Sequence, residues 1–202
     1  MASQAAHPRD TRARLASEAA RVMAEQAIDD PFEARSRAAM RLGLQQSREL
    51  PSGEEVVAAL RDYLALFQAE AQRQRLFRLR HAACEMMRRL ASLAEVRLVG
   101  PVLDGTALDA TPVTLHLLGI TGEEVAIHLL DLGVNFRERA RQVSYGPGDQ
   151  RTVPAFQLRQ ADCSIELLAF SPDAPRQAPV SPVTGKAQRR ATLGTVQGLL
   201  EG

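Results

Sequence analysis

Apolar residues recur at helical spacing in the first half of the chain. Leu15 and Ala19 begin a series spaced three or four residues apart, which predicts an amphipathic helix of about four turns. Asp30 and Pro31 then supply a capping side chain and a proline at the first helical position. The pattern therefore predicts a second helix, which should end near Gly43 because glycine suits the left-handed residue that closes a helix.

The next helical stretch is longer and has a clear start. Ser52 and Glu55 form the sequence pattern of a capping box, and residues 54–94 contain neither glycine nor proline. Apolar residues continue at helical spacing on both sides of a polar run at 72–75. We expect a bend or a loop between two helices at this polar run.

After residue 94 the pattern changes to alternation. Short strands are expected at 96–100, 113–117, 139–145, 151–159 and 164–170, with a turn at 146–149. Helices are expected at 122–132 and 192–200, and the proline-rich stretch 171–188 should be an extended loop. The fold class expected is α+β, with a helical region at 1–94 followed by a mixed sheet flanked by helices at 95–202.

Composition adds limits on function. The 202 residues are 45% hydrophobic, and 25 basic against 24 acidic side chains give a net charge of +1. This is typical of a globular protein, and it gives no overall field for nucleic acid or membranes. The only cysteines, Cys84 and Cys163, are too few for a zinc site or a disulfide framework. The polar start at 1–14 and the lack of a long apolar run predict a cytoplasmic protein without membrane contact.

One segment carries a recognisable pattern. Gly100-Pro101 follows an expected strand, Gly105-Thr106 comes four residues later, and the strand from Val113 follows. This order is similar to the signature of the nucleotidyltransferase (polymerase β-like) superfamily, and the chain also resembles a small bacterial family with a helical region before this core. The resemblance covers residues 95–170. It implies that Gly100, Gly105 and Thr106 approach the phosphates of a nucleotide.

The same resemblance implies a loss of catalysis. In the superfamily, two acids at alternate positions of the second strand and a third acid from a neighbouring strand hold Mg²⁺. In this chain, Pro112 and Thr114 occupy the places of the paired acids, Pro101 replaces a usual serine, and Glu166 fits the third acid. We therefore expect a degenerate member that binds a nucleotide or another anion but does not transfer a nucleotidyl group.

Two alternatives remain open at this point. The first is an active, atypical nucleotidyltransferase in which Glu166 works with His116 or Asp109, and this alone would require Mg²⁺ and a nucleotide as substrate. Against it, a single strand histidine is usually a structural residue, and Asp109 has the spacing of a turn residue.

The second alternative is an interaction module in the helical half. Glu85 is the only acid among six arginines that would form a face for a protein or nucleic-acid partner: Arg73, Arg75, Arg78, Arg80, Arg88 and Arg89. The first two helices also loosely resemble the start of a tetracycline-repressor-type regulator, which would place Arg35, Arg37 and Arg41 on a groove-reading helix. A solvated helix face explains the same arginines without a partner.

Overall fold

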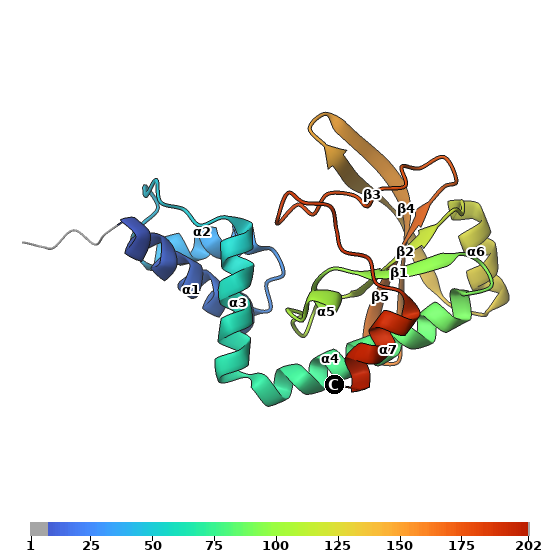
Figure 1. Cartoon of the computed structure of the whole chain (residues 1–202), viewed down its shortest axis with the longest axis horizontal. Helices are drawn as coiled ribbons and strands as arrows, with labels where there is room; N and C mark the ends of the chain where they lie inside the picture. The colour runs from blue at the N-terminus through green and yellow to red at the C-terminus, as the bar shows by residue number, and fades with distance from the viewer. Residues whose placement is uncertain (1–7, 202) are drawn as a thin grey trace, which may run out of the picture. The chain divides into compact units, whose positions relative to one another are not determined.

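The computed structural model describes residues 8–201, which form two compact units (Figure 1). The first unit runs to Gln72 and includes Leu108–Ala110, and the second contains 73–107 and the residues from Thr111 onward. The sequence predicted a boundary at 94/95 instead. The difference arises because the apolar side of the long helix ending at Leu90 is part of the core beneath the sheet.

The first unit is a three-helix arrangement of α1 (Pro8–Gln26), α2 (Pro31–Arg41) and α3 (Gly53–Phe67). Its core combines small alanines with larger side chains of α3 such as Leu60 and Leu64. The alanines let the helix backbones approach closely, so a small unit can still exclude water. Leu108 is buried in the same cluster.

Helix starts predicted from the sequence are confirmed. The Asp30 carboxylate accepts a hydrogen bond of 2.8 Å from the Phe32 amide, and Ser52 and Glu55 make the reciprocal bonds of a capping box. Gly43 has a φ of 68°, as expected after α2. A second capping box at Thr121 and Glu124 starts α6 (Gly122–Asp131).

The predicted bend at 72–75 lies elsewhere. The helix is interrupted at Gln68, whose φ of −136° and ψ of 26° are not helical, and α4 (Ala69–Leu90) runs without a break through the polar stretch. Glutamine and arginine are good helix formers, and the polar run therefore does not stop the helix. Inside α4, Gln72 and Arg75 are buried despite their polarity.

The second unit contains a five-stranded mixed sheet in the order β1-β2-β5-β4-β3. Its strands are β1 (Glu95–Val99), β2 (Val113–Leu118), β3 (Phe136–Gly146), β4 (Asp149–Gln160) and β5 (Cys163–Phe170). β2 and β5 are parallel, and the other neighbours are antiparallel. The α+β class and the mixed sheet expected from the sequence are therefore present.

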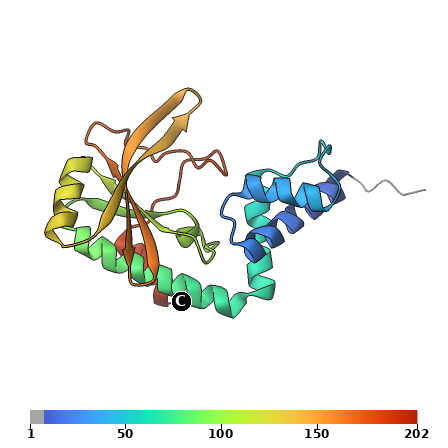
Figure 2. The same ribbon diagram turned by 180° about the vertical axis from the view of Figure 1, so that it is seen from behind.

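The β3–β4 hairpin is longer than the sequence predicted. Only Ala155–Gln160 of β4 pair with β5, so the remainder of the hairpin projects beyond the other strands as a two-stranded arm (Figure 2). Pro147 and Gly148 form the turn at its tip, between the paired residues Gly146 and Asp149.

Helices cover one face of the sheet. Alternate strand residues, among them Leu98, Leu115, Phe156 and Leu167, join the apolar sides of α4 and α6 in the largest core cluster. Val196 of α7 (Leu193–Glu201) packs in the same cluster, and α5 (Pro101–Asp104) is a single turn after β1. The opposite face carries a smaller apolar cluster, which includes Val153, Leu168 and Phe170, beside polar side chains.

The C-terminal segment 171–192 crosses that opposite face (Figure 1). It bonds to the end of β3, where the Val180 amide donates to the Ser144 carbonyl, and to β1, where Ala191 and Leu98 exchange two backbone hydrogen bonds. The stretch predicted as a loop is thus ordered but forms no regular strand, because its prolines lack the amide donors that strand pairing needs. We call residues 171–192 the strap.

Two sequence expectations concern location. None of the helices formed by residues 8–201 is long and apolar enough to cross a membrane. The polar start at 1–14, from which a cytoplasmic protein was predicted, includes residues 1–7, which lie outside the described part of the chain.

Candidate functional site

A polar row crosses the face of the sheet that the helices leave open. The strand register places Thr114 beside Val99 and Glu166, and it places Glu166 beside Gln157, which in turn pairs with Arg137. Directly paired residues point to the same side of a sheet. The hydroxyl, carboxylate, amide and guanidinium groups of four neighbouring strands therefore lie side by side, and we call Thr114, Glu166, Gln157 and Arg137 the polar row.

The polar row is accessible. Thr114 and Glu166 are half-buried, and Gln157 and Arg137 are exposed. None of these four side chains makes a hydrogen bond or an ion pair with another residue of the described chain. Their polar groups are consequently available to a ligand, and the row contains one acid and one base.

The glycine turn predicted to bind phosphates lies at the end of β1. Gly100 has a φ of 75° and Gly105 a φ of 83°, conformations that other residues adopt rarely. Most backbone amides of this turn already donate hydrogen bonds within the turn or have no hydrogen to donate. Pro101 has no amide hydrogen, the Asp104 amide donates to the Gly100 carbonyl, and the amides of Gly105 and Thr106 both donate to the Pro101 carbonyl. The Thr106 side chain is buried, so the turn offers a ligand few contacts.

Pro112 and Thr114 occupy the positions where the resemblance would require acids. Thr114 is on β2, directly opposite Glu166 on β5, and Pro112 precedes β2 by one residue. Pro112 has no group that binds a cation, and a threonine hydroxyl is a weak substitute for a carboxylate. Among residues 8–201 there is no group of three or more histidine, cysteine, aspartate or glutamate side chains suited to a metal ion.

His116 is structural in character. Its side chain is 1% exposed, and its Nδ1 accepts a hydrogen bond of 3.3 Å from Arg190 Nε. The ring also packs against Phe170, with 4.7 Å between ring centroids. Burial, helped by the positive charge of Arg190, lowers the pKa of His116 to about 3. The imidazole is therefore neutral at pH 7, and one of its two nitrogens is already occupied.

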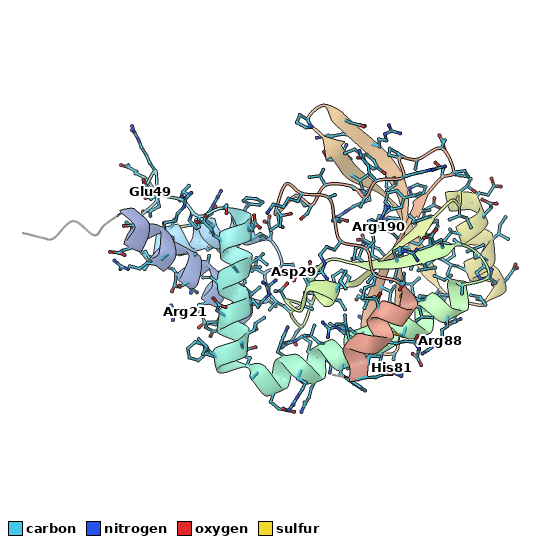
Figure 3. The ribbon with its side chains drawn as sticks, in the orientation of Figure 1. Arg21, Asp29, Glu49, His81, Arg88 and Arg190 are labelled. Atoms are coloured by element: carbon cyan, nitrogen blue, oxygen red, sulfur yellow. The ribbon has the colours of Figure 1, made fainter. Side chains whose placement is uncertain are left out.

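Arg190 holds the strap over the sheet (Figure 3). Besides its bond to His116, it donates to the Arg176 carbonyl, and its guanidinium lies 5.4 Å above the ring of Phe170. Burial lowers the pKa of Arg190, although not enough to remove its charge at neutral pH. The neighbouring Arg189 is exposed and pairs with Asp104.

Asp109, the other predicted partner of Glu166, does not belong to the sheet unit. It is exposed and lies in the segment Leu108–Ala110 of the first unit. The sheet unit therefore supplies Glu166 with neither an accessible histidine nor this aspartate, and the active alternative keeps only one of its three expected residues in the polar row.

The six arginines of α4 do not form one continuous face. Arg75 is buried, and Arg80 is half-buried and donates to the carbonyls of Val102 and Leu199. Burial lowers the pKa of Arg80. Arg78, Arg88 and Arg89 are exposed, and successive helical residues differ by about 100° in direction. A single docking surface made of all six is consequently not available.

The arginines of α2 are engaged within the first unit. Arg35 donates to the Pro51 carbonyl at 2.8 Å, Arg37 pairs with Glu33, and Arg41 pairs with Glu18 and Glu25. Reading a DNA groove would require these side chains to leave their present partners. These contacts are typical of a packed helical bundle and leave no free arginines of α2 for reading a DNA groove.

Comparison of the chain with protein-family models, with curated proteins and with solved structures finds no match. The resemblance to nucleotidyltransferases therefore depends on the sequence pattern alone.

Gln157 and Arg137 were not anticipated as site residues. They enter the row only because the hairpin brings them opposite Glu166. The predicted turn at 146–149 alone would not have found this pair, because a register shift between Ser144 and Gly146 moves the pairing by one residue and Arg137 would otherwise face Leu158.

Proposed function

We propose that the sheet unit is a nucleotidyltransferase-like binding domain that holds a nucleotide at the polar row and does not transfer it. The observation that supports this most directly is the pairing of Thr114 with Glu166, which leaves one carboxylate where a transferase needs three. The proposal separates binding from chemistry, because the groups that recognise a nucleotide differ from those that hold its metal ions.

Each residue of the polar row can form hydrogen bonds with a particular part of a nucleotide. A guanidinium such as Arg137 can bind phosphate oxygens with two parallel hydrogen bonds. The Glu166 carboxylate accepts hydrogen bonds from ribose hydroxyls or a base amine, and the Gln157 amide can donate and accept. These groups span neighbouring strands, which are about 5 Å apart, so one ligand can touch several of them.

The absence of paired acids has a consequence for binding. A metal bridge would not be needed to hold the phosphates, and affinity should therefore be the same with Mg²⁺ and with a chelator. Glu166 should oppose the negative phosphates, whereas Arg137 should attract them. The two residues thus give opposite and measurable effects.

Isothermal titration calorimetry with ATP, GTP, CTP and UTP, with and without EDTA, tests the proposal. We expect at least one nucleotide to bind equally well in both conditions. Arg137→Gln should weaken binding, Glu166→Gln should strengthen it, and Arg88→Gln on α4 is a charge-matched control that should have no effect. Binding of none of the four nucleotides would refute the proposal.

Transfer is measured separately with α-labelled nucleotides and Mg²⁺ or Mn²⁺. We expect neither labelled product nor released pyrophosphate. Turnover that Glu166→Gln abolishes would instead support the active alternative and overturn the non-catalytic part of the proposal.

A further inference from the structure

β3 is an edge strand whose outer side is largely open. It pairs with β4 on one side only, and in the described part of the chain its outer side meets just one bridge, between Ser144 and Val180. The stretch Phe136–Val143 therefore presents alternate amide and carbonyl groups to solvent. These groups can pair with an added strand.

One face of this edge carries a row of arginines. Arg137, Arg139 and Arg141 alternate along β3 and point to the same side, about 7 Å apart. All three are exposed, and none makes an ion pair within the described chain. Arg139 donates only a long bond of 3.4 Å, to the carbonyl of Glu138. The edge thus combines unpaired backbone groups with a positive charge at every second residue.

We propose that the open edge of β3 binds an extended acidic segment of another protein by strand addition. In an added strand, side chains at alternate positions face those of β3 across about 5 Å. Carboxylates at these positions would meet Arg137, Arg139 and Arg141, while the backbone completes the hydrogen bonds of the edge. This partner is separate from the nucleotide proposed above, although Arg137 borders both surfaces.

Two observations favour a peptide over nucleic acid. The strap already adds one residue to this edge, since the Val180 amide donates to the Ser144 carbonyl at 2.6 Å. The aromatic residues of β3 are also unavailable for stacking on bases, because Tyr145 is buried and Phe136 packs against the core. A phosphate backbone accepts hydrogen bonds but cannot donate to the carbonyls of an edge, whereas a peptide does both.

The test uses the full chain and a fluorescein-labelled peptide in which glutamate alternates with valine or threonine. Fluorescence anisotropy should show saturable binding that a lysine-for-glutamate peptide lacks. Arg139→Gln/Arg141→Gln should weaken binding about five- to tenfold, as the loss of two exposed ion pairs predicts. Arg78→Gln/Arg88→Gln on α4 removes the same charge elsewhere and should leave affinity unchanged.

Backbone pairing is tested with two peptides that are N-methylated at every second residue, one at the odd-numbered positions and the other at the even-numbered positions. Only one of these two sets of amides points toward β3 in an added strand. One peptide should therefore lose affinity at least tenfold, and the other should bind as tightly as the unmodified peptide. Amide hydrogen exchange along β3 should slow when the unmodified peptide is bound.

Several results would overturn the proposal. The proposal fails if the acidic peptide does not bind, if the two N-methylated peptides bind equally well, or if the Arg139→Gln/Arg141→Gln variant binds the peptide with unchanged affinity. Tighter binding of a thymidine oligonucleotide that displaces the peptide would assign the surface to nucleic acid instead. A free protein that sediments as a dimer, with β3 amides already protected, would assign the edge to a second copy. Nucleotide calorimetry on the same variant distinguishes this failure from that of the proposed function, because Arg137 and Glu166 are intact.

Discussion

Arg190 donates its Nε–H to Nδ1 of His116 across 3.3 Å, although the two residues are 74 positions apart. Both side chains contact the ring of Phe170. The bond requires Nδ1 to be unprotonated, and the positive charge of Arg190 disfavours a second charge beside it. The contact therefore couples the position of the strap to the protonation state of a buried histidine.

The first prediction concerns the pH dependence of stability. His116 has a pKa of about 3 in the folded protein and about 6.5 when unfolded. The unfolded chain binds the extra proton between these values, so the free energy of unfolding is at its full value above pH 6.5 and decreases as the pH falls toward 3. Urea denaturation at pH 7, 6, 5 and 4 should show this loss, with a contribution of up to about 1.4 kcal/mol per pH unit.

The variant His116→Gln isolates that contribution. Glutamine can accept the Arg190 hydrogen bond but does not titrate, and the variant should therefore lose less stability than the wild type on going from pH 7 to pH 4. His81→Gln, which changes an exposed histidine on α4, should keep the wild-type dependence. Parallel pH curves for wild type and His116→Gln would contradict the prediction.

The second prediction concerns the anchoring of the strap. Arg190→Met removes two hydrogen bonds and the contact with the ring of Phe170, and we expect a loss of about 1–3 kcal/mol in the free energy of unfolding. Limited proteolysis should also cleave segment 171–192 faster. Arg189→Met, at an exposed neighbour, is the control. Equal protease sensitivity of the two variants would show that Arg190 does not hold the strap.

The third prediction concerns the contact between α6 and β4. A Cβ at Gly122 would lie 2.7 Å and 2.8 Å from two ring carbons of Pro154. The proline ring cannot rotate away, so Gly122→Ala should destabilise the protein by about 1–3 kcal/mol in thermal or urea denaturation. Gly198→Ala in α7 has open space around the new methyl group and should be neutral or stabilising by up to about 1 kcal/mol. A neutral Gly122→Ala would mean that α6 can shift away from β4.

The fourth prediction restores the missing acids. Pro112→Asp/Thr114→Asp places one carboxylate opposite Glu166 and a second one just before β2, and the combined site should bind Mn²⁺, which electron paramagnetic resonance can detect. Repulsion among the three acids should lower the melting temperature, and Mg²⁺ should raise it again. The uncharged Pro112→Asn/Thr114→Asn variant should show neither effect. Failure of the acidic variant to bind Mn²⁺ would argue against the superfamily resemblance.

The local elements were largely predictable from residue patterns. The caps at Asp30 and Ser52 and the left-handed Gly43 depend on interactions within a few residues, and the structure confirms them. The break at Gln68 was not predictable, because residues 54–94 contain neither glycine nor proline and no local signal marks the interruption. The division of the chain at Gln72 was missed for a related reason, since it depends on what α4 packs against.

For the candidate site, the sequence supplied Thr114 and Glu166 but not their neighbours. Their pairing depends on the parallel alignment of β2 and β5, whose residues are about 50 positions apart in the chain. Gln157 and Arg137 could not be paired from the hairpin turn, because the register shift between Ser144 and Gly146 gives no signal in the sequence, nor could they be placed beside Glu166. Strand alternation from Thr114 suggested His116 as a candidate ligand, and only the tertiary structure showed that Arg190 already bonds to it.

The sequence by itself determined the helix caps, the alternation of the strands and the α+β class. These features depend on residue identity and on contacts between near neighbours in the chain. The tertiary structure decided which face of the sheet the helices leave uncovered, which residues share the polar row, and which strand is left at the edge. Those features depend on contacts between distant segments, since strand order and register are set by the packing of the whole unit.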